Sequence, residues 1–400
     1  MRSKVVLLLT FLLFSIFNAQ ASSQKVLYTF TGGIDGAQPL QAGVVFDQAG
    51  NLYGVTQGGG AYNLGTVFEL TPSPDGSWTE TVLWSFTGGS DGSTPQGGLA
   101  YDGGGNVYGT TIYGGTINNW CGTLFLYQIQ APPGTGFELL HSFNDISRDG
   151  CQSQSDVVYD GYYVYGTTVF GGGRAEGGTI FRWGPGGEYL VWRCPGKGNW
   201  WPSGLSLFGN GLYGTASGFG YFPGNVFEVF GYPIYEVRPT RSFSLKSKEG
   251  YYPMGDLATQ VNEEGLRIMY GATYQGGVGG LGAIYQLTEK IKGSDRWHIS
   301  LVHSFSGSDG AYPGAGVVLD AAGNLYGTTR FGGRGNSGTV FKLTPGAKNK
   351  WTYNMLYSFT GAADGAQPTG ALVFDNAGNL YGTTYAGGAY GQGVVYEVTP

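Results

Sequence analysis

The sequence predicts an all-β fold: a seven-bladed β-propeller with four-stranded blades, closed into a ring by an N-terminal strand. Three observations predict it. The 400-residue chain contains 76 glycines, 15% aromatic residues and only 12% charged residues, a composition that disfavours both disorder and long helices. One sequence unit recurs seven times. The chain also begins with a strand that its last unit lacks.

The repeating unit is marked by the dipeptide Tyr-Gly, which recurs at spacings of 48 to 57 residues at Tyr53, Tyr108, Tyr165, Tyr213, Tyr270, Tyr326 and Tyr381. Each copy lies among four short β-type segments separated by Gly, Asp, Asn and Pro, which we name strands A, B, C and D. In the last unit, strand A is 372–375, strand B is 380–384 and strand C is 394–398; the strand D at 356–359 precedes them. Four strands per unit without helical periodicity are typical of propeller blades.

The two ends of the chain are complementary. The last unit ends on its strand C and has no strand D of its own, whereas residues 25–30 match the strand D sequence of other units, such as 82–86. An N-terminal strand at this position would complete the C-terminal blade and remove two open sheet edges. We therefore expect the strand at 25–30 to close the ring.

Residues 1–21 have the pattern of a secretory signal peptide. Arg2 and Lys4 precede an apolar run, 5–17, and Ala19-Gln20-Ala21 is a cleavage motif. The run is shorter than the ~20 residues that span a bilayer. Cleavage leaves one domain, residues 22–400, with 19 basic and 27 acidic residues and a net charge of −8. We expect a secreted monomer, extracellular or periplasmic, without a transmembrane segment; its acidity disfavours nucleic acid as a partner.

The sequence of the repeating unit resembles that of a known family. The order Tyr-Ser-Phe-Thr-Gly, Asp-Gly, Gly-Asn-Leu-Tyr-Gly-Thr-Thr, Gly-Gly and Gly-Thr-Val-Phe is similar to that of the bacterial GloVer tandem-repeat proteins, best at residues 27–115 and 303–400. The resemblance implies export and a repeat architecture. Members often carry a C-terminal surface anchor, and none is visible here. The family has no established activity, so the resemblance implies no catalytic residues.

The loops between strands D and A carry acidic residues followed by glycine at matching places. They are Asp35, Asp91, Asp149, Asp309 and Asp364, with Glu249 in the same place in one further loop. A ring of carboxylates could bind a ligand or Ca²⁺, which takes 6–8 oxygen ligands. The alternative is that Asp-Gly is turn chemistry, repeated because the unit is repeated.

The loops between strands B and C carry planar side chains and should share a face with the D–A loops. The candidates for ligand binding are Tyr113, Phe170, Tyr274, Arg330, Phe331 and Tyr385. Flat aromatic side chains suit the apolar faces of sugar rings, and Tyr, Trp and Arg also dominate protein interfaces. The alternative is that these rings pack between blades.

Cysteine is scarce and its count is odd. Cys121 lies in a B–C loop and Cys151 in the following D–A loop, so the two could form a disulfide on one face. An export route permits such a bond. Cys194 would remain unpaired.

These features favour a binding or interaction module for a glycan or protein ligand on the face of the D–A and B–C loops. One alternative is a polysaccharide-degrading hydrolase or lyase that uses the acidic loop residues. A second is a structural envelope protein without a small ligand. The sequence has no zinc-like spacing, no Gly-x-Ser-x-Gly elbow and no phosphate loop, so we expect no cofactor and no metal, and binding is favoured over catalysis.

Overall fold

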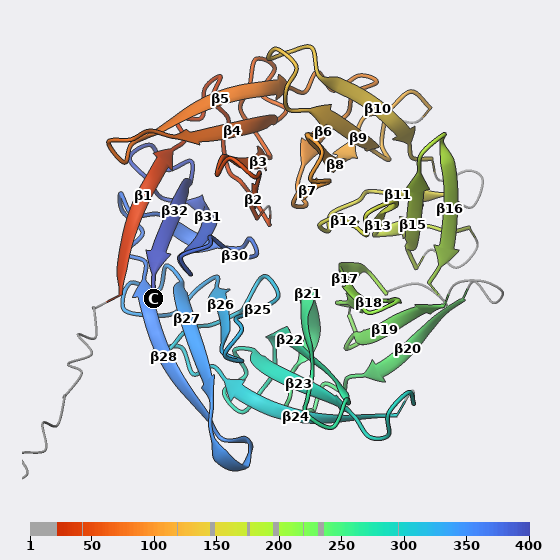
Figure 1. Cartoon of the computed structure of the whole chain (residues 1–400), viewed down its shortest axis with the longest axis vertical. Coiled ribbons are helices and arrows are strands. Elements are labelled where there is room, and N and C mark those ends of the chain that lie inside the picture. Colours follow the sequence, from red (N-terminus) through yellow and green to blue (C-terminus); the bar gives the residue numbers. More distant parts are fainter. Residues whose placement is uncertain are drawn as a thin grey trace, which may run out of the picture.

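The computed structural model describes residues 22–400 except 42, 118, 145–148, 174–176, 195–199, 219, 231–235 and 295. The predicted signal peptide, 1–21, lies outside this part of the chain. Seven antiparallel four-stranded sheets are arranged in a ring, which confirms the predicted seven-bladed propeller (Figure 1). In each blade, strand A lies next to the ring axis and strand D lies at the outside.

Blades 1 to 4 follow the predicted strand order A, B, C, D. Their strands are β2 (Val45–Phe46), β3 (Leu52–Thr56), β4 (Thr66–Pro72) and β5 (Trp78–Ser85); β7 (Ala100–Tyr101), β8 (Asn106–Tyr113), β9 (Thr123–Gln128) and β10 (Phe137–Ser142); β12 (Val158–Tyr159), β13 (Val164–Thr168), β15 (Thr179–Gly184) and β16 (Glu188–Arg193); β17 (Pro202–Phe208), β18 (Gly211–Ala216), β19 (Asn225–Phe230) and β20 (Glu236–Ser242).

Blades 5 to 7 have the same strand order. The strands are β21 (Tyr251–Val261), β22 (Arg267–Gln275), β23 (Ala283–Glu289) and β24 (Trp297–Ser304); β25 (Val318–Leu319), β26 (Leu325–Thr329), β27 (Thr339–Pro345) and β28 (Trp351–Ser358); β30 (Val373–Phe374), β31 (Leu380–Ala386), β32 (Val394–Thr399) and β1 (Ser23–Thr29). Short extra strands also pair in the loops of three blades. They join β6 (Ser93–Pro95) to β8 in blade 2, β11 (Gly150–Cys151) to β14 (Phe170–Gly171) in blade 3 and β29 (Ala366–Pro368) to β31 in blade 7.

The N-terminal strand closes the ring as predicted. β1 pairs antiparallel with β32 from Ser23 opposite Thr399 to Thr29 opposite Val394. The pairing supplies strand D of blade 7, so the first and last strands of the domain lie in one sheet. The strand begins two residues before the predicted Lys25 and ends one before Phe30, whose N–H still donates to the carbonyl of Gly393 at 3.1 Å.

The glycine of each Tyr-Gly dipeptide lies under an aromatic ring of the neighbouring strand C. A Cβ on any of these seven glycines would come within 2.3–2.7 Å of that ring or its hydroxyl, in the pairs Gly54–Phe68, Gly109–Phe125, Gly166–Phe181, Gly214–Phe227, Gly271–Tyr285, Gly327–Phe341 and Gly382–Tyr396. The seven rings are fully buried. The repeated dipeptide is therefore a packing requirement of the blade interior, because glycine alone leaves room for the ring.

The hairpin between strands A and B explains the repeated Asp-x-x-Gly-Asn motif. In blade 6, the Asp320 carboxylate accepts hydrogen bonds from the N–H groups of Ala322 and Asn324, at 2.9 and 2.8 Å, and from the Tyr326 hydroxyl at 3.0 Å. Aspartate thus fixes the turn and holds the tyrosine of the next strand. The A–B hairpins lie at one end of the blades, and the D–A and B–C loops lie at the opposite end.

Candidate functional site

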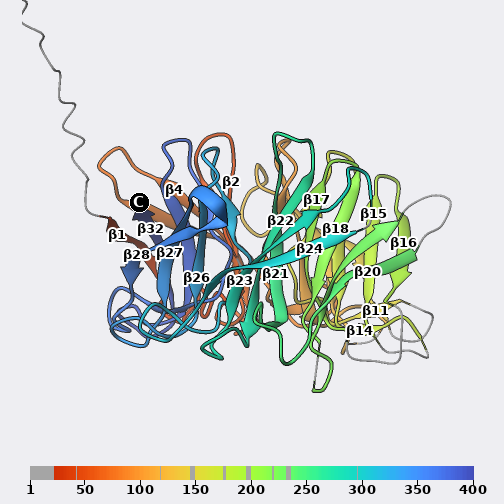
Figure 2. The ribbon, with the colours of Figure 1, turned by 90° about the horizontal axis from the view of Figure 1, so that it is seen from below.

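A cavity of about 550 Å³ lies on the ring axis, at the face formed by the D–A and B–C loops. This is the face at which β11 and β14 lie, near the lower edge of the molecule in Figure 2. All seven blades contribute D–A residues to its lining, and B–C residues complete it. Its volume falls within the range of small-molecule sites.

An unusual backbone conformation recurs in the D–A loops at this face. In every blade, a D–A residue at the same place has a left-handed backbone, with φ between 47° and 61°, although none of the seven is glycine: Gln38, Thr94, Gln152, Trp201, Tyr252, Tyr312 and Gln367. Blade 1 has a second left-handed residue, Gln41, with φ 56°. A left-handed conformation costs a non-glycine residue about 1–2 kcal/mol. The conformation joins neighbouring blades: the N–H of Tyr312 donates to the Leu281 carbonyl of blade 5 at 2.7 Å, while its carbonyl accepts from Arg330 of blade 6 at 3.1 Å.

Glycine would adopt this conformation without strain, and the chain uses glycine freely elsewhere. The left-handed backbone at seven non-glycine positions is therefore held by the surrounding contacts, such as the bonds from Arg330 to the Gln367 side chain. All seven can form hydrogen bonds, and none is charged. Trp201 and Tyr252 of this set line the cavity directly.

The cavity has two chemically different walls. Amide side chains of Gln41, Gln96 and Gln154 come from the consecutive blades 1, 2 and 3. Aromatic side chains come from blades 4, 5 and 7, which complete the ring together with blade 6 (Figure 1): Trp201, Tyr252, Tyr274 and Tyr385. The amide of Gln275, from blade 5, lines the cavity beside Tyr274. A ligand in the cavity would therefore meet amide groups from blades 1 to 3 and flat aromatic surface, with one further amide, from the other blades.

Three of the six predicted planar side chains line this cavity: Tyr274, Arg330 and Tyr385. The guanidinium of Arg330 is held in place, because its Nε and Nη2 both donate to the Gln367 amide oxygen at 3.2 Å. It also lies over the ring of Phe331, 5.3 Å from the ring centroid. Phe331 thus supports Arg330 from outside the cavity lining.

The structure does not bring Tyr113 and Phe170 into the cavity. Tyr113 packs against Trp120, with ring centroids 5.3 Å apart, and Phe170 packs edge-on to Trp201 at 6.0 Å. Both therefore lie on the same face but outside the cavity lining. Sequence reasoning missed Gln41, Gln96 and Gln154. They lie two or three residues after the left-handed residue of their loops, and no residue type marks this place, because other blades have Ser203, Met254 or Thr369 there.

The five predicted aspartates lie outside the cavity lining, and each is bonded within its own loop. Asp35 accepts from the Thr31 N–H at 2.7 Å and from the Tyr28 hydroxyl at 3.1 Å. Equivalent bonds from the strand D side chain reach Asp91 from Trp84, Asp149 from His141, Asp309 from His303 and Asp364 from Tyr357. Glu249 also bonds within its loop, accepting from the Ser247 hydroxyl. These contacts are turn chemistry, since the carboxylates already have local donors.

No group of three or more His, Cys, Asp or Glu residues able to hold a metal ion occurs among the residues that the structure describes. In the same described part of the chain, no helix is long and apolar enough to cross a membrane.

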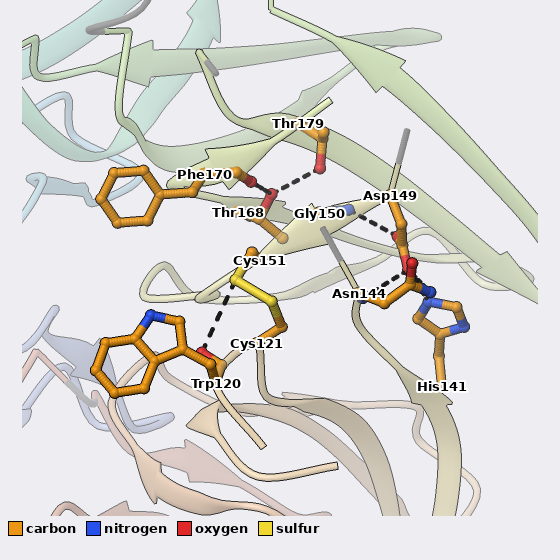
Figure 3. The surroundings of a disulfide bond; sticks show 10 residues. All are labelled: Trp120, Cys121, His141, Asn144, Asp149, Gly150, Cys151, Thr168, Phe170 and Thr179. Atoms are coloured by element: carbon orange, nitrogen blue, oxygen red, sulfur yellow. Dashed lines mark hydrogen bonds and ion pairs between the residues drawn. A yellow bond between two sulfur atoms is a disulfide. The ribbon is translucent and has the colours of Figure 1, made fainter. Parts of the chain in front are cut away.

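A disulfide links two neighbouring blades at this face. Cys121, in the B–C loop of blade 2, is bonded to Cys151 of β11, and Asp149 with its partner His141 lies close by (Figure 3). The Nε2 of His141 and the Asp149 carboxylate are 2.8 Å apart. Burial raises the pKa of Asp149, but hydrogen bonds from His141 and Tyr189 outweigh this effect and hold it below its usual value. Cys194 is buried and free.

Below the cavity, the axis narrows to a space of about 20 Å³ flanked by Asp156 and Asp256. Each aspartate uses one oxygen to accept a backbone N–H of the preceding blade, Gly98 at 2.5 Å and Leu205 at 2.9 Å. Burial raises the pKa of Asp156 to about 6, and burial together with the charge of Asp156 raises the pKa of Asp256 well above its usual value. The equivalent residues of the other blades are Gly43, Gly98, Gly204, Gly316 and Ala371.

Solved structures are similar to this chain at low identity. A candidate 6-phosphogluconolactonase from Bacteroides uniformis is 15% identical, with a TM-score of 0.50 over 79% of this chain and 84% of that chain. A luciferin-regenerating enzyme is 12% identical, with a TM-score of 0.48 over 95% and 96%. A candidate glucose dehydrogenase from Thermus thermophilus is 14% identical, with a TM-score of 0.44 over 95% and 100%. At such identities, the likeness concerns the fold alone.

Sequence comparison identifies the family. None of the curated proteins matches this sequence. The Gloeobacter/Verrucomicrobia repeat matches residues 13–181 and 267–400, which is most of the chain and agrees with the resemblance seen in the repeat unit. The chain thus belongs to the Gloeobacter/Verrucomicrobia repeat family.

Proposed function

We propose that this protein is an exported glycan-binding module whose ligand enters the axial cavity. The observation that carries the proposal is the pairing of an amide wall, from Gln41, Gln96 and Gln154, with an aromatic wall that includes Tyr252 and Tyr274. A sugar ring has apolar C–H faces and a rim of hydroxyl groups. Such a ring could stack on one wall while its hydroxyls bond to the other, because amides both donate and accept hydrogen bonds.

The charge of the cavity supports a neutral ligand. Arg330 is the one charged side chain in its described lining, and the Gln367 amide already engages it. A phosphate or polyanion site would gather several basic groups. Uncharged donors and acceptors beside flat rings match a neutral glycan better than a nucleotide or an acidic peptide.

Export is part of this proposal. The signal-peptide pattern at 1–21 supports it, and so does the Cys121–Cys151 disulfide, because such bonds persist in oxidising compartments. An exported module would meet extracellular or cell-wall glycans.

Binding has more support than catalysis or a purely structural role. The acidic loop residues that a hydrolase would use are bonded to their own turns, as Asp35 is to Thr31. An open cavity of about 550 Å³ lined by amide and aromatic side chains supports a binding role over a purely structural one. Glycan capture without product release is therefore the function that the geometry supports best.

A glycan array with the purified protein, residues 22–400, tests this proposal. We expect saturable binding to a neutral oligosaccharide, and a loss of about tenfold or more when Tyr274 or Tyr385 is replaced by alanine, since a buried aromatic contact contributes about 2 kcal/mol to binding. Tyr390→Ala is the matched control, because Tyr390 is an aromatic B–C residue that is 62% exposed and outside the cavity lining. Absence of binding to any glycan would refute the proposal, and new reducing ends appearing over time would favour the hydrolase.

A further inference from the structure

The axial cavity is open at one end and blocked at the other. Neighbouring blades meet backbone to backbone around the axis: a Cβ on Gly97 would lie 2.0 Å from the Ser155 carbonyl oxygen, and one on Gly316 would lie 2.0 Å from the Asp256 carbonyl oxygen. The space below the cavity, about 20 Å³, is the size of one water molecule. Among the residues that the structure describes, a polymer chain therefore has no path through the ring.

The lining makes one asymmetric site out of seven similar units. Proline follows the left-handed residue in six of the seven D–A loops, and the packing glycines of strand B recur in every blade. By contrast, the cavity-facing positions differ, with Gln96 in blade 2, Ser203 in blade 4 and Thr369 in blade 7. A symmetric protein would offer seven equivalent sites, whereas these differences build a single one.

The bottom of the site is rich in hydrogen-bond acceptors. Asp156 and Asp256 occupy positions at which the other blades have glycine or alanine. Each bonds to a backbone N–H through one oxygen, and no ion pair to either is found among the described residues. Donor groups of a ligand that reached the bottom would meet these carboxylates together with the Gln41 and Gln154 side chains.

We propose that the protein recognises the end of a glycan chain, one chain end per molecule, with the terminal unit inserted toward Asp156 and Asp256. This inference rests on the glycan-binding function proposed above and specifies which part of the glycan is bound. A blind cavity of about 550 Å³ admits a ligand of roughly two or three sugar rings. An internal unit of a long chain cannot be inserted in this way, because the chain on one side of it would have to pass through the closed bottom.

Calorimetry with the oligosaccharide selected on the array tests the proposal. The probes are a length series of that oligosaccharide and two derivatives, each carrying a bulky blocking group on one of its two ends. We expect one oligosaccharide per protein, an affinity that stops rising beyond roughly three units, and a loss of more than tenfold for one of the two blocked derivatives. Equal binding of both derivatives and the free chain would overturn end recognition while leaving glycan binding intact.

A pair of variants tests whether the ligand reaches the bottom of the cavity. Asp256→Asn keeps an acceptor for the Leu205 N–H but replaces the second carboxyl oxygen with an NH₂ group. We expect it to weaken binding about tenfold, because a ligand donor directed at that oxygen would lose its acceptor. The matched control is Asp364→Asn, a D–A carboxylate outside the cavity lining, which should bind as the parent does. Unchanged affinity in Asp256→Asn, with unchanged melting, would overturn insertion toward the bottom. No binding to any glycan on the array would instead refute the proposed function.

Discussion

Three of the seven joints between neighbouring blades contain a stacked pair of rings among their described residues, and the joint where the propeller closes does not. On the outer strands, an aromatic ring of one blade stacks on the strand D side chain of the preceding blade: Phe137 lies on Trp84, Tyr189 on His141 and Tyr353 on His303, with ring centroids 3.9–4.7 Å apart. Strand pairing places Glu80 at the equivalent position of blade 1. A carboxylate thus takes the place of a ring at the joint where the propeller closes.

Glu80 should make the stability of the closed ring depend on pH. Its Oε1 is buried without a hydrogen-bond partner, and it faces Tyr28 and Asp35. Burial, and then the charge of Asp35, raise the pKa of Glu80 from 4.5 to about 7. The folded state therefore favours the protonated acid, so stability is full below the unfolded pKa and falls as pH rises from about 4.5 to about 7.

Replacing Glu80 with glutamine should remove this pH dependence. We expect Glu80→Gln to be more stable than the parent above neutral pH by about 1–2 kcal/mol, an amount reduced for the solvent screening of a partly exposed side chain. Denaturant unfolding at about pH 5 and about pH 8 measures the difference. Glu138→Gln, on the exposed surface of the equivalent strand of blade 2, is the control. An unchanged pH slope in Glu80→Gln would contradict this account.

At the scale of elements, the contact between strands B and C determines the repeated sequence. The Cζ of Phe341 in β27 would lie 2.7 Å from a Cβ on Gly327 in β26. Gly327→Ala should destabilise the protein by about 1–3 kcal/mol, as overpacked cores do. Phe341→Leu should relieve the clash, so that the double variant loses less stability than the two single variants together. Equilibrium unfolding of the four proteins measures this coupling, and strictly additive losses would show that the glycine is not required by the ring.

The fold was largely predictable at this scale, because its signals are local and repeated seven times. Each of these signals reflects a contact within one blade. This holds for the Tyr-Gly dipeptide, for the Asp-x-x-Gly-Asn motif and for the two chain ends that pair in blade 7. The fourth unit has the shortest spacing between Tyr-Gly dipeptides and lacks the Asp-x-x-Gly-Asn hairpin motif. It still forms the four strands β17 to β20. Its strand A reaches β18 without the aspartate turn, with Phe208 opposite Gly211.

At the scale of the whole molecule, the cavity was only partly predictable. Tyr274, Arg330 and Tyr385 could be suspected from their residue types, whereas Gln41, Gln96 and Gln154 lie in three different blades and have no local signature. The residues meet only because closure of the ring by β1 brings seven loops around one axis. The acidic loops are repeated for the converse reason: each carboxylate, such as that of Asp35, makes its bonds within its own blade.

The central claim is that a glycan occupies the axial cavity, and a crystal structure with the array-selected oligosaccharide tests it most directly. We predict one oligosaccharide per chain, stacked on Tyr252 and Tyr274, bonded to Gln41, Gln96 and Gln154, and directed with its terminal unit toward Asp256. Electron density for the sugar on the exposed B–C loops, around Tyr62 or Tyr390, with the axial cavity free of it, would contradict the claim.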